Sequence, residues 1–262
     1  MAYKTILVEK ANATALVTLN RPTKLNAINA QMIDELLQVF TDLRQDINTR
    51  FVIFTGAGTS FTAGADIAGR QSGELQSAHV QRIAQLRGHD FIHALESLEQ
   101  ITIAAVNGYS LGAGLVIAMG CDFRIASTDA KFGIPEANVG IFFTWGCTPR
   151  LVAIVGPTKA KEMIMTCDII DAEEAHRIGL VNTVVPPEQL MEAAHNLVNK
   201  VGSKAPLAIR IAKKMVNAAA APNIGDLYPC EPELVERLYL SQDPSEGASA
   251  FKEKRQPRFT GT

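Results

Sequence analysis

The chain has 262 residues, of which 47% are hydrophobic and 20% charged, so its composition is that of a globular protein and excludes a disordered or fibrous one. Its 25 basic and 27 acidic residues leave a formal net charge of −2, and we expect neither nucleic acid nor a membrane surface as a partner. The four cysteines lack CxxC spacing, and no apolar stretch has the length of a membrane span. We therefore expect a soluble, cytoplasmic protein.

Strands and helices alternate in the first part of the chain. Three apolar segments, 14–19, 51–55 and 101–106, are predicted to be strands, and the unalternating apolar runs are typical of strands buried on both faces. Between them, apolar residues recur at helical spacing over 33–43 and 83–98. This order predicts an α/β fold with right-handed crossovers.

The second half of the chain is predicted to be mostly helical from Pro157 onward. Asp171 and Asp243, each followed by residues that favour a first helical turn, mark two helix starts. The predicted helices cover 159–166, 172–178, 187–201, 207–219, 231–241 and 244–254. We therefore expect an α/β core followed by a helical region.

Five junctions rich in glycine or proline are candidate positions for chemistry. They cover 19–27, 56–66, 107–116, 131–140 and 140–150. The glycines at 56–58 match a dinucleotide-binding fingerprint poorly. The strand–glycine–helix pattern at 107–116 either directs backbone N–H groups at a ligand or packs a helix closely on a sheet, and both interpretations remain open.

Glu136 is a carboxylate in an otherwise apolar segment. Burial there would raise its pKa toward the range useful for proton transfer, whereas the alternative is a surface glutamate at a helix start. Trp145, the only tryptophan, is by itself predicted to be a core residue. His89 and His93 lie four residues apart without a third ligand nearby, so we interpret them as surface histidines rather than a metal site.

Taken together and in this order, the segments resemble the crotonase family, the enoyl-CoA hydratase/isomerase superfamily, from about Ile6 to the C-terminus. The matching segments are 19–22, 26–27, 61–66, 107–108, 112–114, 121–126, 132–136, 156–160, 175–182 and 250–251. The resemblance implies a crotonase-type ββα spiral core over residues 1–195, which binds acyl-CoA and carries the catalysis. It also implies a helical C-terminal trimerisation region over residues 196–262, which completes the CoA site.

The resemblance further implies an acyl-CoA thioester as substrate, with no cofactor and no metal, because coenzyme A is part of the substrate. Glu136 matches the catalytic acid/base, and the backbone N–H groups of Ala63 and Ala113 match the oxyanion hole. The residues that match substrate or CoA contacts are Lys24, Leu25, Ala63, Gly64, Ala65, Asp66, Ile67, Gly112, Trp145, Phe251 and Lys254. The family assembles as a homo-oligomer, a trimer or a hexamer, and the amphipathic helices after Leu207 are the expected assembly surface.

The chain departs from the hydratases of this family at Val116, which stands where they carry a second glutamate. One carboxylate is enough for a proton shift between C2 and C4, so an enoyl-CoA double-bond isomerase is favoured. The alternative is a hydratase of enoyl-CoA or of a cyclic dienoyl-CoA. A third hypothesis is a catalytically weak paralogue that binds CoA esters, or RNA through the basic cluster at Arg210, Lys213 and Lys214.

The segment 142–147 carries bulky rings where many family members have a turn rich in proline and glycine. The rings either narrow the acyl pocket, which would suit a cyclic or aromatic acyl group, or fill core space. No aspartate lies between Glu136 and Arg150, so the nucleophile of the family's aromatic dehalogenases is not expected.

Overall fold

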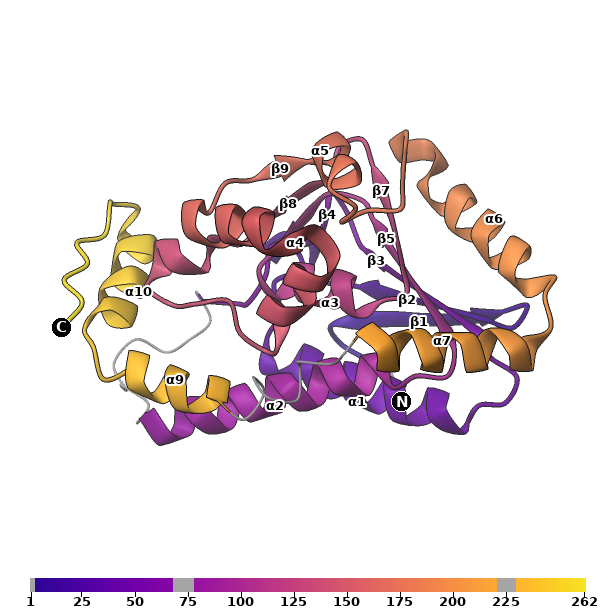
Figure 1. Ribbon diagram of the computed structural model, residues 1–262, viewed down its shortest axis with the longest axis horizontal. Helices are drawn as coiled ribbons and strands as arrows, with labels where there is room; N and C mark the ends of the chain where they lie inside the picture. The colour runs from indigo at the N-terminus through magenta and orange to yellow at the C-terminus, as the bar shows by residue number, and fades with distance from the viewer. Residues whose placement is uncertain (1–2, 68–77, 221–229) are drawn as a thin grey trace.

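The computed structural model describes residues 3–67, 78–220 and 230–262, and it contains two β-sheets surrounded by helices (Figure 1). The larger sheet contains, in spatial order, β1 (Ile6–Ala11), β2 (Thr14–Leu19), β3 (Phe51–Gly56), β5 (Ile101–Val106), β7 (Phe123–Ser127) and β10 (Thr183–Val185). The smaller sheet contains β4 (Ser60–Thr62), β6 (Tyr109–Leu111), β8 (Lys131–Gly133) and β9 (Ile170–Asp171). Neighbouring strands run parallel except in the pairs β1–β2 and β8–β9.

The two sheets are built by successive turns of one spiral. The strand pairs β3 with β4, β5 with β6, and β7 with β8 follow one another along the chain, and each pair contributes one strand to each sheet. Sheet order therefore follows chain order from β1 to β10. This arrangement confirms the predicted ββα spiral core.

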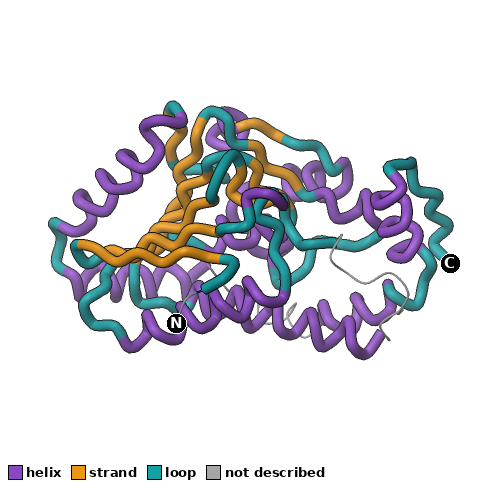
Figure 2. The backbone as a smooth tube through the Cα atoms, turned by 180° about the vertical axis from the view of Figure 1, so that it is seen from behind, coloured by secondary structure: helices purple, strands orange, loops and turns teal. Residues whose placement is uncertain are grey.

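Both faces of the larger sheet are covered, as the unalternating apolar strands predict. On β3, Phe51 and Ile53 pack against α6 (Leu190–Gly202), which lies along one side of the sheet (Figure 2). Val52 and Phe54 point to the opposite face, where Phe54 meets Phe40 of α1 (Ala30–Gln45) at a ring distance of 6.1 Å. Successive strand residues face opposite sides, so a strand between two cores is apolar at most positions on both faces.

The other helices agree with the predicted pattern, with one difference. They are α2 (Ala78–Glu96), α3 (Ala113–Gly120), α4 (Cys147–Thr166), α5 (Ala172–Arg177), α7 (Pro206–Ala220), α9 (Cys230–Leu238) and α10 (Asp243–Glu253), with short 3-10 helices η1 (Pro22–Lys24), η2 (Pro135–Val139) and η3 (Pro187–Gln189). α4 begins twelve residues before the predicted start at residue 159, because helical residues lie on both sides of a kink at Gly156, where φ is 77°. Gly156-Pro157 is a strong helix-breaking pair, which is why the first half of α4 was not predicted.

The C-terminal helices pack on the same chain's core. α9 lies against α2, and α10 lies against η2 (Figure 1). The predicted division at residue 195 stays a prediction; that residue lies inside α6, which packs on the larger sheet. Within the described residues, no helix is both long enough and apolar enough to cross a membrane.

Candidate active site

Three segments that are far apart in the sequence meet at the N-terminal end of α3. The first is the turn at 63–66 after β4, and a Cβ atom placed on Gly64 would lie 3.7 Å from the backbone N of Ala113. The second is Gly112, which caps α3 with φ 47°. The third is η2, because a Cβ atom on Gly112 would overlap Oε1 of Glu136. Glycine at position 112 is therefore required both by the left-handed backbone and by the carboxylate above it.

The Glu136 carboxylate is buried against this helix start without a hydrogen-bond partner for one of its oxygens. The residue as a whole is partly exposed, but Oε2 is sealed from solvent and has no partner among the described residues. Burial raises the pKa of Glu136 from 4.5 to about 7, and only its own backbone N–H acts in the opposite direction. A carboxylate with this pKa accepts and returns protons near neutral pH. A buried polar atom without a partner calls for an explanation, such as a catalytic role or a bound water or ligand.

Two segments at this junction each carry a backbone N–H group without an acceptor in the described part of the chain. Ala113 is the first residue of α3, where N–H groups have no partner within the helix. Ala65 lies opposite Ile28 in a parallel bridge. The Ile28 N–H donates to the Gly64 carbonyl oxygen and the Asp66 N–H donates to the Ile28 carbonyl oxygen. The N–H of Ala65, which lies between these two bonds, therefore points away from Ile28. No acceptor within the described part of the chain takes it.

The expectation that Ala63 offers a free N–H is wrong. The Ala63 N–H donates to the carbonyl oxygen of Leu25 at 2.9 Å, so this group already has a partner. The donor available in the turn is two residues further along, at Ala65.

No second carboxylate faces this point from α3 or from the 63–66 turn. Val116 lies one turn into α3 and is 2% exposed, within a helix whose residues are all buried. The acid of the turn, Asp66, forms an ion pair with Arg21 at 2.8 Å. Glu136 is therefore the single acid that meets the start of α3 in the described part of these segments.

A model of the enoyl-CoA hydratase/isomerase family matches residues 9–262. The chain belongs to the enoyl-CoA hydratase/isomerase family. It is 40% identical over 260 residues to the crotonyl-CoA hydratase of Syntrophomonas wolfei, with 99% of each chain covered. This confirms the resemblance to the crotonases.

Solved structures that are similar to this chain are named for different reactions. The chain is similar to an enoyl-CoA hydratase of Mycobacterium avium subsp. paratuberculosis, with 26% identity, a TM-score of 0.88, and 99% and 100% of the two chains covered. It is equally similar to a methylmalonyl-CoA decarboxylase, with 27% identity, a TM-score of 0.88 and both chains fully covered. The reaction therefore has to be argued from the site rather than from the fold.

The residues expected to contact CoA lie in two places. Lys24 and Leu25 are exposed beside the 63–66 turn, which Leu25 holds through its carbonyl group. Ile67 closes the turn by donating to the carbonyl oxygen of Ala65 at 2.9 Å. Phe251 on α10 and Lys254 directly after it are exposed, and their roles as CoA contacts stay predictions.

Asn26 belongs to the matched motif, but its structural role was not predicted from the sequence. It is fully buried, and its side-chain amide donates to the carbonyl oxygens of Ala57 and Ser60, at 2.9 and 2.7 Å. These bonds tie the 19–27 loop to the strand that leads into the 63–66 turn.

The aromatic residues of segment 142–147, after η2, pack partly in the main core and partly against α2. Phe143 is 1% exposed and belongs to the main core. Trp145 is partly buried, and its ring lies edge-on to Phe91 of α2 at 6.1 Å. A Cβ atom on Gly88 of α2 would overlap the indole, so Gly88 leaves the space that the ring occupies.

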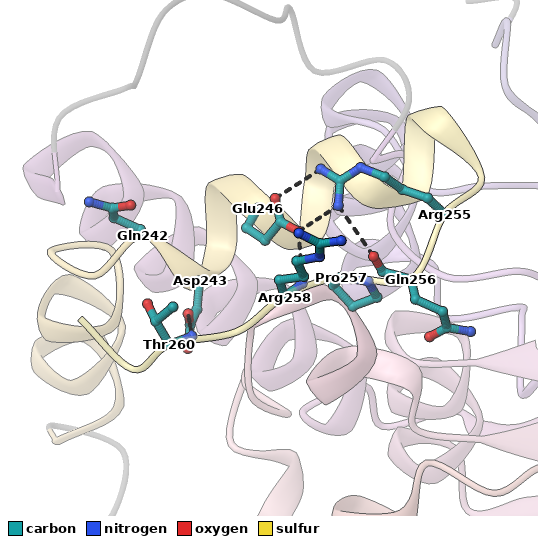
Figure 3. Close-up of a pocket in the computed structure, with 8 residues that line it drawn as sticks. All are labelled: Gln242, Asp243, Glu246, Arg255, Gln256, Pro257, Arg258 and Thr260. Atoms are coloured by element: carbon teal, nitrogen blue, oxygen red, sulfur yellow. Dashed lines mark hydrogen bonds and ion pairs between the residues drawn. The ribbon is translucent and has the colours of Figure 1, made fainter.

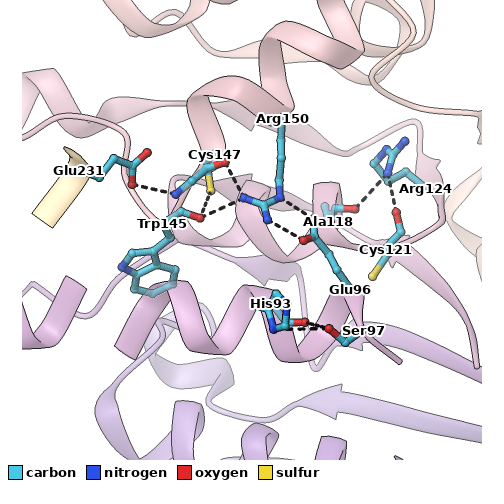
Figure 4. Close-up of polar contacts among 11 residues, drawn as sticks. His93, Glu96, Ser97, Ala118, Cys121, Arg124, Trp145, Cys147, Arg150 and Glu231 are labelled. Carbon is cyan, nitrogen blue, oxygen red and sulfur yellow. Dashed lines mark hydrogen bonds and ion pairs between the residues drawn. The ribbon is translucent and has the colours of Figure 1, made fainter. Parts of the chain in front are cut away.

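A buried polar cluster surrounds the backbone at Trp145 and Gly146 (Figure 4). Glu231 of α9 accepts the Gly146 N–H at 2.8 Å and lies 3.0 Å from Nε2 of His89. Arg150 of α4 donates to the Trp145 carbonyl oxygen at 3.3 Å and to that of Gly146. It also forms a two-pronged ion pair with Glu96, in which Nη2 and Oε2 are 2.6 Å apart.

This cluster was not foreseen, and the interpretation of His89 as a surface residue is wrong. His89 is buried on the inner side of α2, whereas His93 is exposed as predicted. Within the described residues, no three His, Cys, Asp or Glu side chains come close enough to hold a metal ion.

Two other charged features are satisfied within the chain. In the basic cluster, Arg210 and Lys214 pair with Glu99, and Lys213 pairs with Asp122 at 2.8 Å. These pairs neutralise the face proposed for RNA. A cavity of about 580 Å³ lies between α10 and the C-terminal segment (Figure 3). One of its two arginines, Arg255, is paired with Glu246 at 2.6 Å.

Proposed function

We propose that this enzyme is an enoyl-CoA double-bond isomerase that uses Glu136 as its single acid/base. The observation that carries the proposal is the buried, unpartnered Glu136 carboxylate above the start of α3, with Val116 at the position of a second acid. Holding and activating a water for hydration calls for two groups, whereas moving one proton within the substrate calls for one.

The reaction begins when Glu136 removes a proton from C2 of a 3-enoyl-CoA. The electron pair of the broken C–H bond moves into a dienolate whose negative charge is carried by the thioester oxygen. The protonated Glu136 then delivers the same proton to C4, the double bond moves to C2–C3, and the carboxylate is restored. The raised pKa of Glu136 suits both steps, because the group must take up and release the proton at similar cost.

The thioester oxygen is bound by the N–H groups of Ala113 and Ala65 in this proposal. Support for Ala65 in place of Ala63 comes from the hydrogen bonds of the turn, since the Ala63 N–H is used by Leu25. Preorganised N–H donors are worth about 3 kcal/mol each when charge develops on an oxygen in a site that excludes water.

A hydratase is the second candidate, because the similar protein of Syntrophomonas wolfei is named a crotonyl-CoA hydratase at 40% identity. In that case a fixed water or another group replaces the second acid at Val116. The acyl-CoA substrate class is the same in both candidates.

The test follows bond migration and hydration separately on 3-enoyl-CoA and 2-enoyl-CoA panels that include short and cyclic acyl groups. We expect migration without appreciable hydration. Rapid hydration of the 2-enoyl esters would contradict the isomerase and favour the hydratase.

Glu136→Gln tests the site itself. The amide cannot accept the proton, so we expect kcat to fall by about a thousandfold while the Kd for a saturated acyl-CoA stays within about threefold. Normal turnover of this variant would show that another group is the base.

A further inference from the structure

The turn formed by Trp145 and Gly146, here called the 145–146 turn, has an unfavourable backbone conformation. Both residues are left-handed, with φ of 63° and 67°. Glycine adopts this conformation freely, but for a bulky residue such as tryptophan it is unfavourable. Such a conformation persists only where the surroundings impose it.

Two buried charges of opposite sign hold this turn. Glu231 of α9 accepts the Gly146 N–H at 2.8 Å. Arg150 of α4 donates to the carbonyl oxygens of Trp145 and Gly146. Hydrogen bonds to charged groups are stronger than bonds between neutral groups, so these contacts offset the backbone strain.

Each charge is itself fixed by a residue of α2. Glu231 lies 3.0 Å from Nε2 of His89, and Arg150 is bidentate with Glu96. Neither Glu231 nor Arg150 is more than 8% exposed at its side chain. The 145–146 turn is therefore held by side chains from three helices, α2, α4 and α9.

The held turn lies next to the site. It follows η2 closely, and the Ile141 N–H after η2 donates back to the Glu136 carbonyl oxygen at 3.1 Å. Cys147, directly after the turn, is fully buried, and burial raises the pKa of its thiol, while Arg150 acts in the opposite direction. α4, which begins directly after the turn at Cys147, also contacts η2, so the end of the turn lies beside the element that carries Glu136.

We infer that Glu231 is a positioning residue that fixes the 145–146 turn as a wall of the acyl pocket, so that α9 sets which acyl groups fit. Glu231 acts through the Gly146 N–H and does not touch the reacting atoms. This inference rests on the proposed acyl-CoA site at Glu136 and adds how the site selects its acyl group.

The chain offers a matched control on the same helix. Glu233 forms an ion pair with Arg82 of α2 at 2.8 Å, but its side chain is 59% exposed. Glu231→Ala and Glu233→Ala therefore each remove a carboxylate that joins α9 to α2, and only the first removes the contact with the turn.

The experiment has two readouts in the full-length protein. The first is acrylamide quenching of tryptophan fluorescence, which reports on the turn directly because Trp145 is the only tryptophan. The second is the ratio of kcat/KM between cyclic and short straight-chain enoyl-CoA esters. We expect Glu231→Ala to double the quenching constant and to change the ratio about tenfold, and Glu233→Ala to leave both within twofold.

Conservative variants separate positioning from stability. The Glu231→Gln amide oxygen still accepts the Gly146 N–H, so we expect this variant to restore most of the wild-type ratio. Glu231→Asp withdraws the acceptor by about 1.5 Å and should move the ratio in the direction of Glu231→Ala. If Glu231→Ala does not fold, the inference is tested by comparing the Glu231→Asp and Glu231→Gln variants. Equal kcat/KM ratios in these two variants would overturn the inference.

Other outcomes are equally decisive. If Glu231→Ala folds with unchanged quenching and unchanged ratios, the inference is overturned. A uniform loss of kcat/KM on every ester would also overturn it, because the turn would then not select among acyl groups. If the wild type turns over no ester, the proposed function fails instead, and the same comparison is made with the Kd values of cyclic and straight saturated acyl-CoA esters.

Discussion

The Glu136 carboxyl group gives the native protein a stability that depends on pH. Its pKa is raised from 4.5 to about 7 by burial, so the native state prefers the neutral form. The stability associated with this preference is fully present below pH 4.5 and is lost as the pH rises through about 7. The ionised carboxylate therefore lowers the free energy of unfolding at the pH values at which it acts as a base.

Glu136→Gln should accordingly be more stable than the wild type at high pH. We expect a gain of up to about 3 kcal/mol in the free energy of unfolding at pH 8, and little difference at pH 4, because the amide is neutral throughout. Urea unfolding at both pH values measures this. An equal difference at the two pH values would mean that the Glu136 pKa is not raised.

Ala113 allows one oxyanion donor to be deleted with little change to the helix. It occupies the first position of α3, where proline is tolerated because the N–H has no partner within the helix. We expect Ala113→Pro to lower kcat by a factor of about 100 to 1,000. Ala172→Pro, at the first position of α5, is the control for proline at a buried helix start away from the site. Equal activity of both variants and the wild type would exclude the Ala113 N–H from the reaction.

At the scale of elements, Gly88 shows how α2 accommodates the indole of Trp145. Alanine normally stabilises a helix interior by about 1 kcal/mol relative to glycine. A Cβ atom at position 88 would overlap the indole, so we expect Gly88→Ala to lower the melting temperature instead. Gly202→Ala in α6 is the control, since its Cβ would meet the Phe51 ring at 3.6 Å, an ordinary contact, and it should be neutral or stabilising. Thermal unfolding compares the two, and a stabilising Gly88→Ala would contradict the packing of Trp145.

The sequence predicts the strands and helices whose apolar residues form a recognisable pattern, and it does not predict the short strands that form only through the spiral arrangement of the chain. β3 and β5 are marked by mainly apolar runs that do not alternate with charged residues, and α1 and α6 by apolar residues on one face. The three-residue strands β4, β6 and β8 are too short to carry a pattern. They exist because successive turns of the spiral place their backbones side by side.

The same distinction applies to the site. Glu136 and Ala113 follow from the family resemblance, and the structure places them in adjacent segments. The direction of each N–H in the 63–66 turn depends on hydrogen bonds to Leu25 and Ile28, so a match of sequence motifs could not predict it. Glu231 was not predicted because nothing in the sequence links it to Gly146, which is 85 residues away.

At the scale of the whole molecule, α7 presents apolar side chains that residues 3–67, 78–220 and 230–262 leave exposed. Ile211 and Met215 are 51% and 67% exposed, and no residue of α7 is buried. An apolar face of this kind is typical of a surface between subunits, in agreement with the homotrimer or hexamer that the family resemblance implies.

We therefore expect the double variant Ile211→Glu with Met215→Glu to dissociate the assembly while each subunit remains folded. Light scattering gives the mass, and circular dichroism checks the fold. A wild type with the mass of one chain would contradict the expected assembly, and a double variant with the mass of an oligomeric wild type would place the assembly surface elsewhere.

The spiral also determines the stage of folding at which the residues of the active site come together. Each parallel strand of the larger sheet joins the edge left by the preceding turn, so the sheet can lengthen one strand at a time from the N-terminal side as the chain is synthesised. Every addition closes a long loop, which makes this route slower than the pairing of hairpins. The Ala65 turn, the start of α3 and Glu136 come from successive turns, and Glu231 comes from near the end of the chain. A nascent or refolding chain thus acquires most of its secondary structure before it has any site, and tryptophan emission should recover after the far-ultraviolet dichroism.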